Sequence, residues 1–228
     1  MVEDAKRQPL ISSLSSIITS IIGVGLLVTA VIQWRQANWG ELFWLAAFMV
    51  SFLIRVPYGV KVRKNVIDDR RDDGRDRVLL FAMFLAMMVL PLVHLSFGVF
   101  SFADYRLPAW ATVIGALLQV GYLWLFWRSH ADLDRNWSPG LELRGDHELV
   151  TRGVYARMRH PMYAAIWLGA IGQALLLHNW IAGFLVVPAF AAMYFLRVPK
   201  EEAMMRARFG AAYDDYASNV GRIWPGKP

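Results

Sequence analysis

The stretch that decides the fold runs from residue 161 to residue 196 and reads PMYAAIWLGAIGQALLLHNWIAGFLVVPAFAAMYFL, without any Asp, Glu, Lys or Arg. Uncharged apolar runs are typical of membrane helices, and about 20 residues suffice to cross a hydrocarbon core of about 30 Å. This run is too long for one crossing, and the polar pair His178-Asn179 near its middle predicts a tight turn. We therefore expect a hairpin of two helices of roughly 16–17 residues each, which crosses a thinned bilayer or enters it incompletely.

Further apolar runs precede this hairpin. Residues 10–34, 78–103 and 107–127 are each long enough to cross a bilayer. Residues 42–60 form another span if Arg55, near its end, extends to the lipid headgroups, and Pro57 is expected to kink or end that helix. The chain is also 57% hydrophobic, above the 45–50% that is usual for soluble domains. The predicted fold class is all-α, a polytopic transmembrane bundle of about five to six membrane helices including the short hairpin.

Lysine and arginine predict the orientation of the bundle. The side that carries the N-terminus also receives residues 61–77, residues 128–159 and the tail from Arg197, whereas the opposite side receives only Arg35 and Arg106. Because cytoplasmic loops are enriched in Lys and Arg, we expect both termini in the cytoplasm, at the inner membrane if the protein is bacterial.

Several function classes are not expected from the composition. The net charge of +6 resides mostly in these flanking segments, so no nucleic-acid partner is expected. Cysteine is absent, which excludes disulfides, thiolate metal ligands and a cysteine nucleophile. The five histidines form no i,i+3 or i,i+4 pair, so we expect no metal site.

Polar residues concentrate in two segments, 132–163 and 197–216, which flank the hairpin. Since a hairpin brings its ends together, Arg159-His160-Pro161 and Lys200-Glu201-Glu202 are expected to be neighbours. Pro161 suits the first position of a helix, and Gly153 suits a turn. The basic residues could simply anchor a span at the headgroups, and the two glutamates could simply favour the first turn of a helix. Equally, they could together hold a cationic or polyhydroxylated cofactor.

The C-terminal segment contains an apolar stripe at helical spacing, which predicts a helix at the membrane interface. Its members are Met205, Phe209, Ala212, Tyr213 and Tyr216. We interpret this stripe as packing or docking at the interface.

Two ordered motifs resemble those of the isoprenylcysteine carboxyl methyltransferase family. The first reads His147-x-Leu149-Val150-x-x-Gly153-x-Tyr155, followed by Arg159-His160-Pro161-x-Tyr163. The second reads Arg197-x-x-x-Glu201-Glu202, followed by Phe209-Gly210-x-x-Tyr213-x-x-Tyr216. The resemblance covers residues 136–225 and suggests a division of the chain into N-terminal helices, 1–108, and a methyltransferase core, 109–228.

The resemblance implies a cytoplasmic pocket for S-adenosylmethionine, with S-adenosylhomocysteine as the product. The residues that would line it are His147, Leu149, Val150, Gly153, Tyr155, His160, Pro161, Tyr163, Glu201 and Glu202. The implied reaction is methyl transfer to a lipophilic acceptor embedded among membrane lipids.

The acceptor group is open at this stage. A carboxylate is ionised at neutral pH and would need an arginine, Arg197 or Arg159, to orient it. An amine would need a base, Glu202 or His160. We favour the carboxylate because arginines dominate the cluster. Related membrane methyltransferases act on phospholipid amines and small thiols, and outside enzymes a transporter or a membrane scaffold is the alternative.

Overall fold

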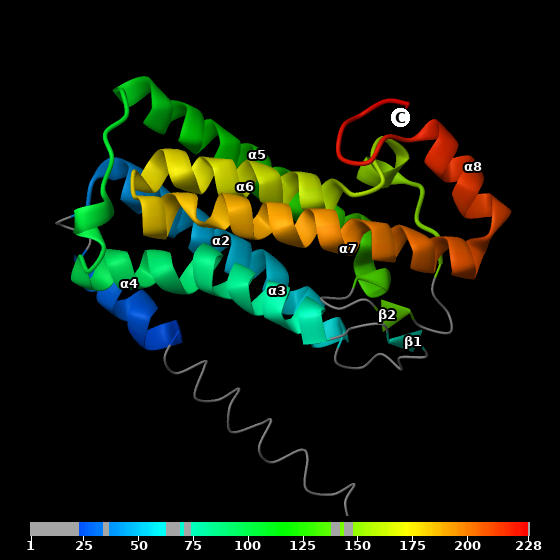
Figure 1. The fold of residues 1–228 in the computed structure, drawn as a ribbon, viewed down its shortest axis with the longest axis horizontal. Helices are drawn as coiled ribbons and strands as arrows, with labels where there is room; N and C mark the ends of the chain where they lie inside the picture. Colours follow the sequence, from blue (N-terminus) through cyan, green and yellow to red (C-terminus); the bar gives the residue numbers. More distant parts are fainter. Residues whose placement is uncertain are drawn as a thin grey trace, which may run out of the picture.

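The computed structural model describes residues 23–33, 37–62, 69–70, 74–137, 142–143 and 148–227. In this part of the chain the protein is a bundle of helices, drawn along its length in Figure 1. The helices are an apolar helix Gly23–Ile32, α2 (Trp39–Val62), α3 (Gly74–Phe84), α4 (Leu90–Phe97), α5 (Ala109–Leu133), α6 (Pro161–Leu177), α7 (Val186–Phe209) and α8 (Ala211–Asn219). Two short strands, β1 (Asp69–Arg70) and β2 (Glu142–Leu143), pair antiparallel beside the bundle.

Four of the described helical segments are long and apolar enough to cross a membrane, which confirms the predicted transmembrane bundle. They are Trp39–Gly59, Gly74–Phe97, Ala109–Leu133 and Trp180–Phe209, with shorter apolar helices at Gly23–Ile32 and Pro161–Leu177. The segment Gly74–Phe97 joins α3 to α4 through a π-helical turn, Leu85–Val89. The protein is thus an integral membrane protein. Of the first predicted span, residues 10–22 and residue 34 lie outside the described part.

The hairpin turn forms where the sequence predicts it. His178 adopts a left-handed conformation with φ of 46° and ends α6. The side-chain oxygen of Asn179 then accepts hydrogen bonds from the backbone N–H groups of Ile181 and Ala182, so it caps the next helical turn, Trp180–Phe184. This local capping replaces bonds that the backbone loses at a helix start.

The second arm of the hairpin differs from the expectation of a short helix. α7 continues without interruption to Phe209 and contains Pro199 in its interior. Likewise, α2 runs through Pro57 to Val62 instead of ending there. The expected C-terminal stripe is also split, because Gly210, with φ of 53°, separates α7 from α8.

Glycines allow α5 and α6 to approach closely. A Cβ atom on Gly115 would lie 2.9 Å from the Cβ of Leu175, and one on Gly172 would lie 3.0 Å from the carbonyl oxygen of Gly115. Small residues at such crossings are typical of membrane helices, where association depends on close packing.

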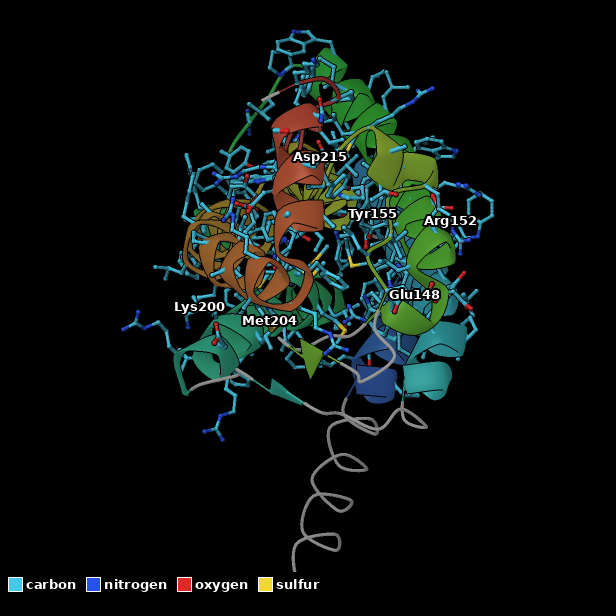
Figure 2. The ribbon with its side chains drawn as sticks, turned by 90° about the vertical axis from the view of Figure 1, so that its right-hand side faces the viewer. Glu148, Arg152, Tyr155, Lys200, Met204 and Asp215 are labelled. Atoms are coloured by element: carbon cyan, nitrogen blue, oxygen red, sulfur yellow. The ribbon has the colours of Figure 1, made fainter. Side chains whose placement is uncertain are left out.

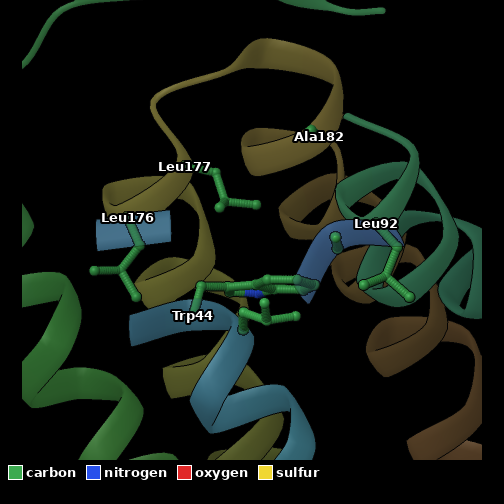
Figure 3. Packing of buried hydrophobic residues seen from close by; sticks show 7 residues of the cluster. Trp44, Leu92, Leu176, Leu177 and Ala182 are labelled. Atoms are coloured by element: carbon green, nitrogen blue, oxygen red, sulfur yellow. The ribbon is translucent and has the colours of Figure 1, made fainter. Parts of the chain in front are cut away.

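An apolar cluster fills the bundle near the hairpin turn, as Figure 3 shows. Its best-buried members include Trp44, Leu92, Leu176, Leu177 and Ala182. These residues come from α2, α4 and both arms of the hairpin, so the cluster fixes this end of the bundle.

Gln173 of α6 is a polar side chain within this apolar interior, and it is only 1% exposed. Its oxygen accepts a hydrogen bond of 3.1 Å from the indole N–H of Trp44. Its amide nitrogen donates to the carbonyl oxygens of Ala86 and Ala182, both at 2.9 Å. α2 and the two π-helical turns, Leu85–Val89 and Trp180–Phe184, are therefore bonded to one side chain.

Replacing Gln173 by Met leaves the indole N–H and two carbonyls without partners, and we expect a loss of about 2–4 kcal/mol in the free energy of unfolding. Thermal unfolding in detergent measures this loss. In a double-mutant cycle, Trp44→Phe should lower the free energy of unfolding less in the Gln173→Met background than in the wild type. The reason is that the hydrogen bond shared by the two residues is already absent from Gln173→Met. Additive losses from the two substitutions would contradict this account.

Candidate functional site

The candidate site lies at the end of the bundle away from the hairpin turn. Figure 1 shows α7 extending past the start of α6 towards α8, with the chain end folding back beside it. Figure 2 views the bundle from this end, where the segment with Glu148 and Tyr155 faces α7 and α8. The expectation that the residues around His160 and Glu201 are neighbours is confirmed, as the following contacts show.

Glu202 of α7 is the centre of a buried ion cluster and is only 1% exposed. The guanidinium of Arg159 donates to its Oε1 through Nε at 3.2 Å and Nη2 at 3.1 Å. Arg222, from the C-terminal tail, donates through Nε to Oε1 at 3.2 Å and through Nη2 to Oε2 at 3.0 Å. The Nε2 atom of His160 lies 3.4 Å from the same Oε1. Two arginines and one histidine thus surround one carboxylate.

Arg159 has further partners that fix the chain end. Its Nη1 atom donates to the carbonyl oxygen of Ala217 at 2.7 Å and also to that of Val220. The backbone N–H groups of Arg159 and His160 donate to the carbonyls of Gly221 and Arg222, at 2.8 and 2.7 Å. Most hydrogen-bond donors of Arg159 are therefore committed to holding the tail against the start of α6.

Glu201, the neighbour of Glu202, has a different environment. Its Oε2 accepts a hydrogen bond of 2.9 Å from the hydroxyl of Tyr163, and its Oε1 lies 3.7 Å from Nδ1 of His160. Its side chain is 31% exposed and lines a cavity. Of the two acidic side chains, Glu201 is the one available to a ligand.

The turn at Gly153 is pinned to α5. Gly153 has φ of 61°, and a Cβ atom there would lie 2.1 Å from Oδ2 of Asp132. That same oxygen accepts a bond of 2.8 Å from the N–H of Val154. Only glycine fits this position, so the turn predicted at Gly153 is confirmed. Tyr155, two residues after Gly153, is buried. Its carbonyl oxygen accepts a hydrogen bond of 2.6 Å from the hydroxyl of Tyr216.

Tyrosine side chains at the site are neutral at physiological pH. Burial raises the pKa of Tyr213 to about 12, with the nearby Glu202 carboxylate adding to the shift. Burial, and then the charge of Glu201, raises the pKa of Tyr155 well above its ordinary value. These side chains can offer hydroxyl donors and aromatic faces, and they do not serve as bases near neutral pH.

A cavity of about 650 Å³ joins a polar end to an apolar end. The polar lining includes Tyr155, Arg159, His160, Tyr163, Arg197, Glu201, Tyr213 and Tyr216, with Leu149 and Val150, and also Ser51, Arg55, Asn136 and Glu148. The apolar lining, from α2, α3, the π-helical turn and α7, comprises Phe48, Phe52, Leu80, Met83, Met87 and Met193. α7 contributes to both ends through Met193, Arg197, Glu201 and Met204, whose spacing of four and three residues places them on one helical face.

Comparison with known proteins identifies the segment that carries these residues. Residues 111–207 match the family model described as the isoprenylcysteine carboxyl methyltransferase (ICMT) family. This segment is thus similar to the isoprenylcysteine carboxyl methyltransferase family. It includes α6, Arg159, His160 and both glutamates, whereas Arg222 and the N-terminal helices lie outside it.

Curated relatives match part of the chain. Protein-S-isoprenylcysteine O-methyltransferase of Schizosaccharomyces pombe is 36% identical over 75 residues, 33% of this chain and 32% of that protein. The Tribolium castaneum protein of the same name is 40% identical over 84 residues, 35% of this chain and 28% of that protein. The nickel-cobalt-cadmium resistance protein NccN of Alcaligenes xylosoxydans xylosoxydans is 30% identical over 114 residues, half of this chain and 52% of that protein. The chain thus spans about a third of the first of these relatives and about half of the last.

A solved structure of a eukaryotic intramembrane Ras methyltransferase, an isoprenylcysteine carboxyl methyltransferase, is similar over 88% of this chain and 72% of that one. The TM-score is 0.57 and the sequence identity 20%, so this likeness shows a shared fold. It extends well beyond the segment 111–207.

The structure places the predicted site residues in three groups. The residues that line the cavity are Leu149, Val150, Tyr155, Arg159, His160, Tyr163, Arg197 and Glu201. Glu202 lies behind the lining, while Gly153 and Pro161 shape the backbone beside it. His147 lies outside the described residues. The roles assigned to these residues remain predictions.

One interpretation of the sequence is wrong. Glu201 and Glu202 lie inside α7, not in the first turn of a helix, so helix-start chemistry does not account for them. The guanidinium carbon of Arg55 lies 5.1 Å from the ring centre of Trp137, and its side chain lines the cavity. Sequence reasoning also missed Arg222, and no local pattern in the tail distinguishes it from a surface arginine.

The burial of the ion cluster sets the expected effects of its variants. Glu202→Gln leaves the buried guanidinium of Arg159 without its counter-charge, which should lower the free energy of unfolding by about 3–5 kcal/mol. Arg222→Met should lower the free energy of unfolding by only about 1 kcal/mol or less, because the side chain of Arg222 is 54% exposed. Thermal unfolding in detergent compares the two variants, and equal losses would show that Glu202 is not the centre of the cluster.

Proposed function

We propose that the chain is a membrane methyltransferase that uses S-adenosylmethionine to methylate the carboxylate of a lipophilic acceptor. The observation that carries this proposal is the single cavity that joins a carboxylate, histidine and tyrosine end to an end lined by Met and Phe from membrane spans. The match of residues 111–207 to the family model and the names of the curated relatives support the same reaction.

The polar end suits the chemical groups of S-adenosylmethionine. Glu201 can accept hydrogen bonds from ribose hydroxyls or from the amino group. His160 and the start of α6 suit its carboxylate. The faces of Tyr155 and Tyr213 can lie against the sulfonium cation. The other residues assigned to this pocket are His147, Leu149, Val150, Gly153, Pro161, Tyr163 and Glu202, of which Glu202 acts from behind by holding Arg159 and His160.

The apolar end suits the lipid-like part of the acceptor. It lies between α2 and α3, whose residues at the cavity belong to membrane-spanning segments. Phe52 and Met87 offer apolar and polarizable surface there, so an acceptor can enter laterally from the bilayer. We place the polar end and both termini on the cytoplasmic side, and assign the methyltransferase core to residues 109–228.

The three residues predicted to be catalytic divide by position. Arg159 and Glu202 hold each other and the chain end, so we assign them positioning roles. Arg197 lines the cavity on the same face of α7 as Glu201, and we assign it to orienting the reacting carboxylate. Glu202 is a poor base for an amine acceptor, because its oxygens already accept bonds from Arg159 and Arg222.

When bound, S-adenosylmethionine supplies an activated methyl group, which passes to the carboxylate oxygen as the sulfur–carbon bond breaks and its electron pair stays on sulfur. The residues of the chain need only align the acceptor and exclude water, and such alignment can supply on the order of 7–11 kcal/mol at best. No proton has to be removed, since a carboxylate is ionised at neutral pH.

Binding of S-adenosylmethionine to the purified protein, measured by calorimetry, tests the cofactor directly. We expect saturable binding to the wild type. The affinity should be at least tenfold lower in Glu201→Gln, because this variant lacks the charged carboxylate that would accept hydrogen bonds from the ligand. The matched control is Asp215→Asn, an exposed acid of α8 outside the cavity, which should bind as the wild type does. Absence of binding by a folded wild type would overturn the proposed function.

The pH dependence of kcat/KM separates a carboxylate acceptor from an amine. A carboxylate is fully ionised above about pH 6, so its methylation should be nearly independent of pH between about 6 and 9. An amine acceptor would show a rise of roughly tenfold per pH unit over this range, because its free base increases with pH. Such a rise with the best acceptor found would contradict the carboxylate assignment.

A further inference from the structure

Arg55 is a charged residue in a membrane-spanning helix and lies outside the family segment. It belongs to α2, within the span Trp39–Gly59, whereas the family model matches residues 111–207 only. Ionisable side chains in such spans are energetically costly, and they commonly mark a binding site or a transport pathway.

The side chain of Arg55 faces the cavity. It contributes to the lining together with Ser51, Tyr122 and Trp137, and it keeps exposed surface there. An arginine that served as a headgroup anchor would direct its charge away from the protein interior. The orientation of Arg55 therefore favours contact with a ligand in the cavity.

Trp137 holds the guanidinium from one side. The distance from the guanidinium carbon of Arg55 to the ring centre is 5.1 Å, which is within the range of a cation–π contact. Trp137 is itself fixed, because its N–H donates to the sulfur of Met162 at 3.3 Å and its ring lies 4.8 Å from that of His130. The stacked face leaves the N–H groups of the guanidinium edge available to an anion.

Within the described residues, Arg55 has no carboxylate partner. This distinguishes it from Arg159, whose charge is compensated by Glu202, and from Arg197, which shares a helical face with Glu201. An anionic ligand in the cavity would thus meet a cation that no carboxylate of the described residues has neutralised.

We propose that Arg55 binds the carboxylate of the acceptor and makes the site selective for anionic acceptors. This inference rests on the proposed function and deepens it, since it assigns selection of the acceptor to Arg55 of α2, in addition to Arg197 of α7, which orients the reacting carboxylate. Arg55, Trp137, Met162 and Tyr163 line the same cavity, so a carboxylate held by Arg55 shares that cavity with the proposed cofactor.

The test compares two ligands that differ only in charge, N-acetyl-S-farnesylcysteine and its carboxamide. Equilibrium binding of each is measured in neutral detergent without anionic lipid, for the wild type, Arg55→Met and Arg55→Lys. We expect the wild type to bind the acid at least tenfold more tightly than the amide. Arg55→Met should abolish this preference while leaving affinity for the amide within about threefold, and Arg55→Lys should retain part of the preference.

Arg128→Met is the matched control. Arg128 also lies over a tryptophan, with 5.4 Å to the ring centre of Trp127, but it pairs with Asp132 and does not line the cavity. The preference for the acid should survive in this variant. A structural role of Arg55 would weaken acid and amide equally, and that result overturns the inference.

Calorimetry with S-adenosylmethionine tests the role of Arg55 separately from the proposed methyltransferase function. Arg55→Met should bind the cofactor as the wild type does, because Arg55 is assigned to the acceptor. A wild type that binds the cofactor yet shows no preference for the acid overturns the inference and leaves the proposed function standing. A wild type that does not bind the cofactor overturns the proposed function itself.

Discussion

The buried carboxylate of Glu202 is the interaction on which the rest of the site depends. It joins three segments that are distant in the sequence, namely the turn at Arg159 and His160, helix α7 and the tail at Arg222. Because Arg159 and Glu202 are both almost excluded from solvent, loss of Glu202 would leave the buried charge of Arg159 without compensation. The same contact orients α7. Consecutive residues of a helix point about 100° apart, so a Glu202 held in the cluster places Glu201 towards the cavity.

The second constraint is the membrane, which fixes how the remaining helices support this arrangement. The close crossing at Gly115 and Gly172, together with the bonds of Gln173, makes α5, α6 and the hairpin turn one rigid unit. α7 then extends from this unit as a continuous helix with one face that changes from apolar Met193 to charged Glu201. The cavity follows that face. A ligand with an apolar tail and a reactive polar head would therefore match the cavity lining, with its tail at the apolar end and its head at the polar end.

Much of the fold could be predicted from the sequence because its signals are local. The turn at His178 and Asn179, the glycine at 153 and the proline at the start of α6 follow from backbone preferences of single residues. The rest depends on tertiary contacts. Pro199 normally argues against a helix interior, and the continuation of α7 through it depends on partners far away in sequence. The role of Arg222 depends on the tail folding back. The direction of Arg55 could not be predicted either, since lipid and protein core are equally apolar and the sequence of α2 does not indicate which face is turned inwards.

Photoaffinity labelling with an azido derivative of S-adenosylmethionine, followed by peptide mapping, tests the central claim most directly. The claim is that residues 148–163, residues 197–216 and the cavity between them form one cofactor site. The account predicts labelled peptides from both segments, protection by excess S-adenosylhomocysteine, and loss of labelling when Glu202→Gln separates α7 from the start of α6. Labelling confined to other segments, or labelling that S-adenosylhomocysteine does not prevent, would contradict it.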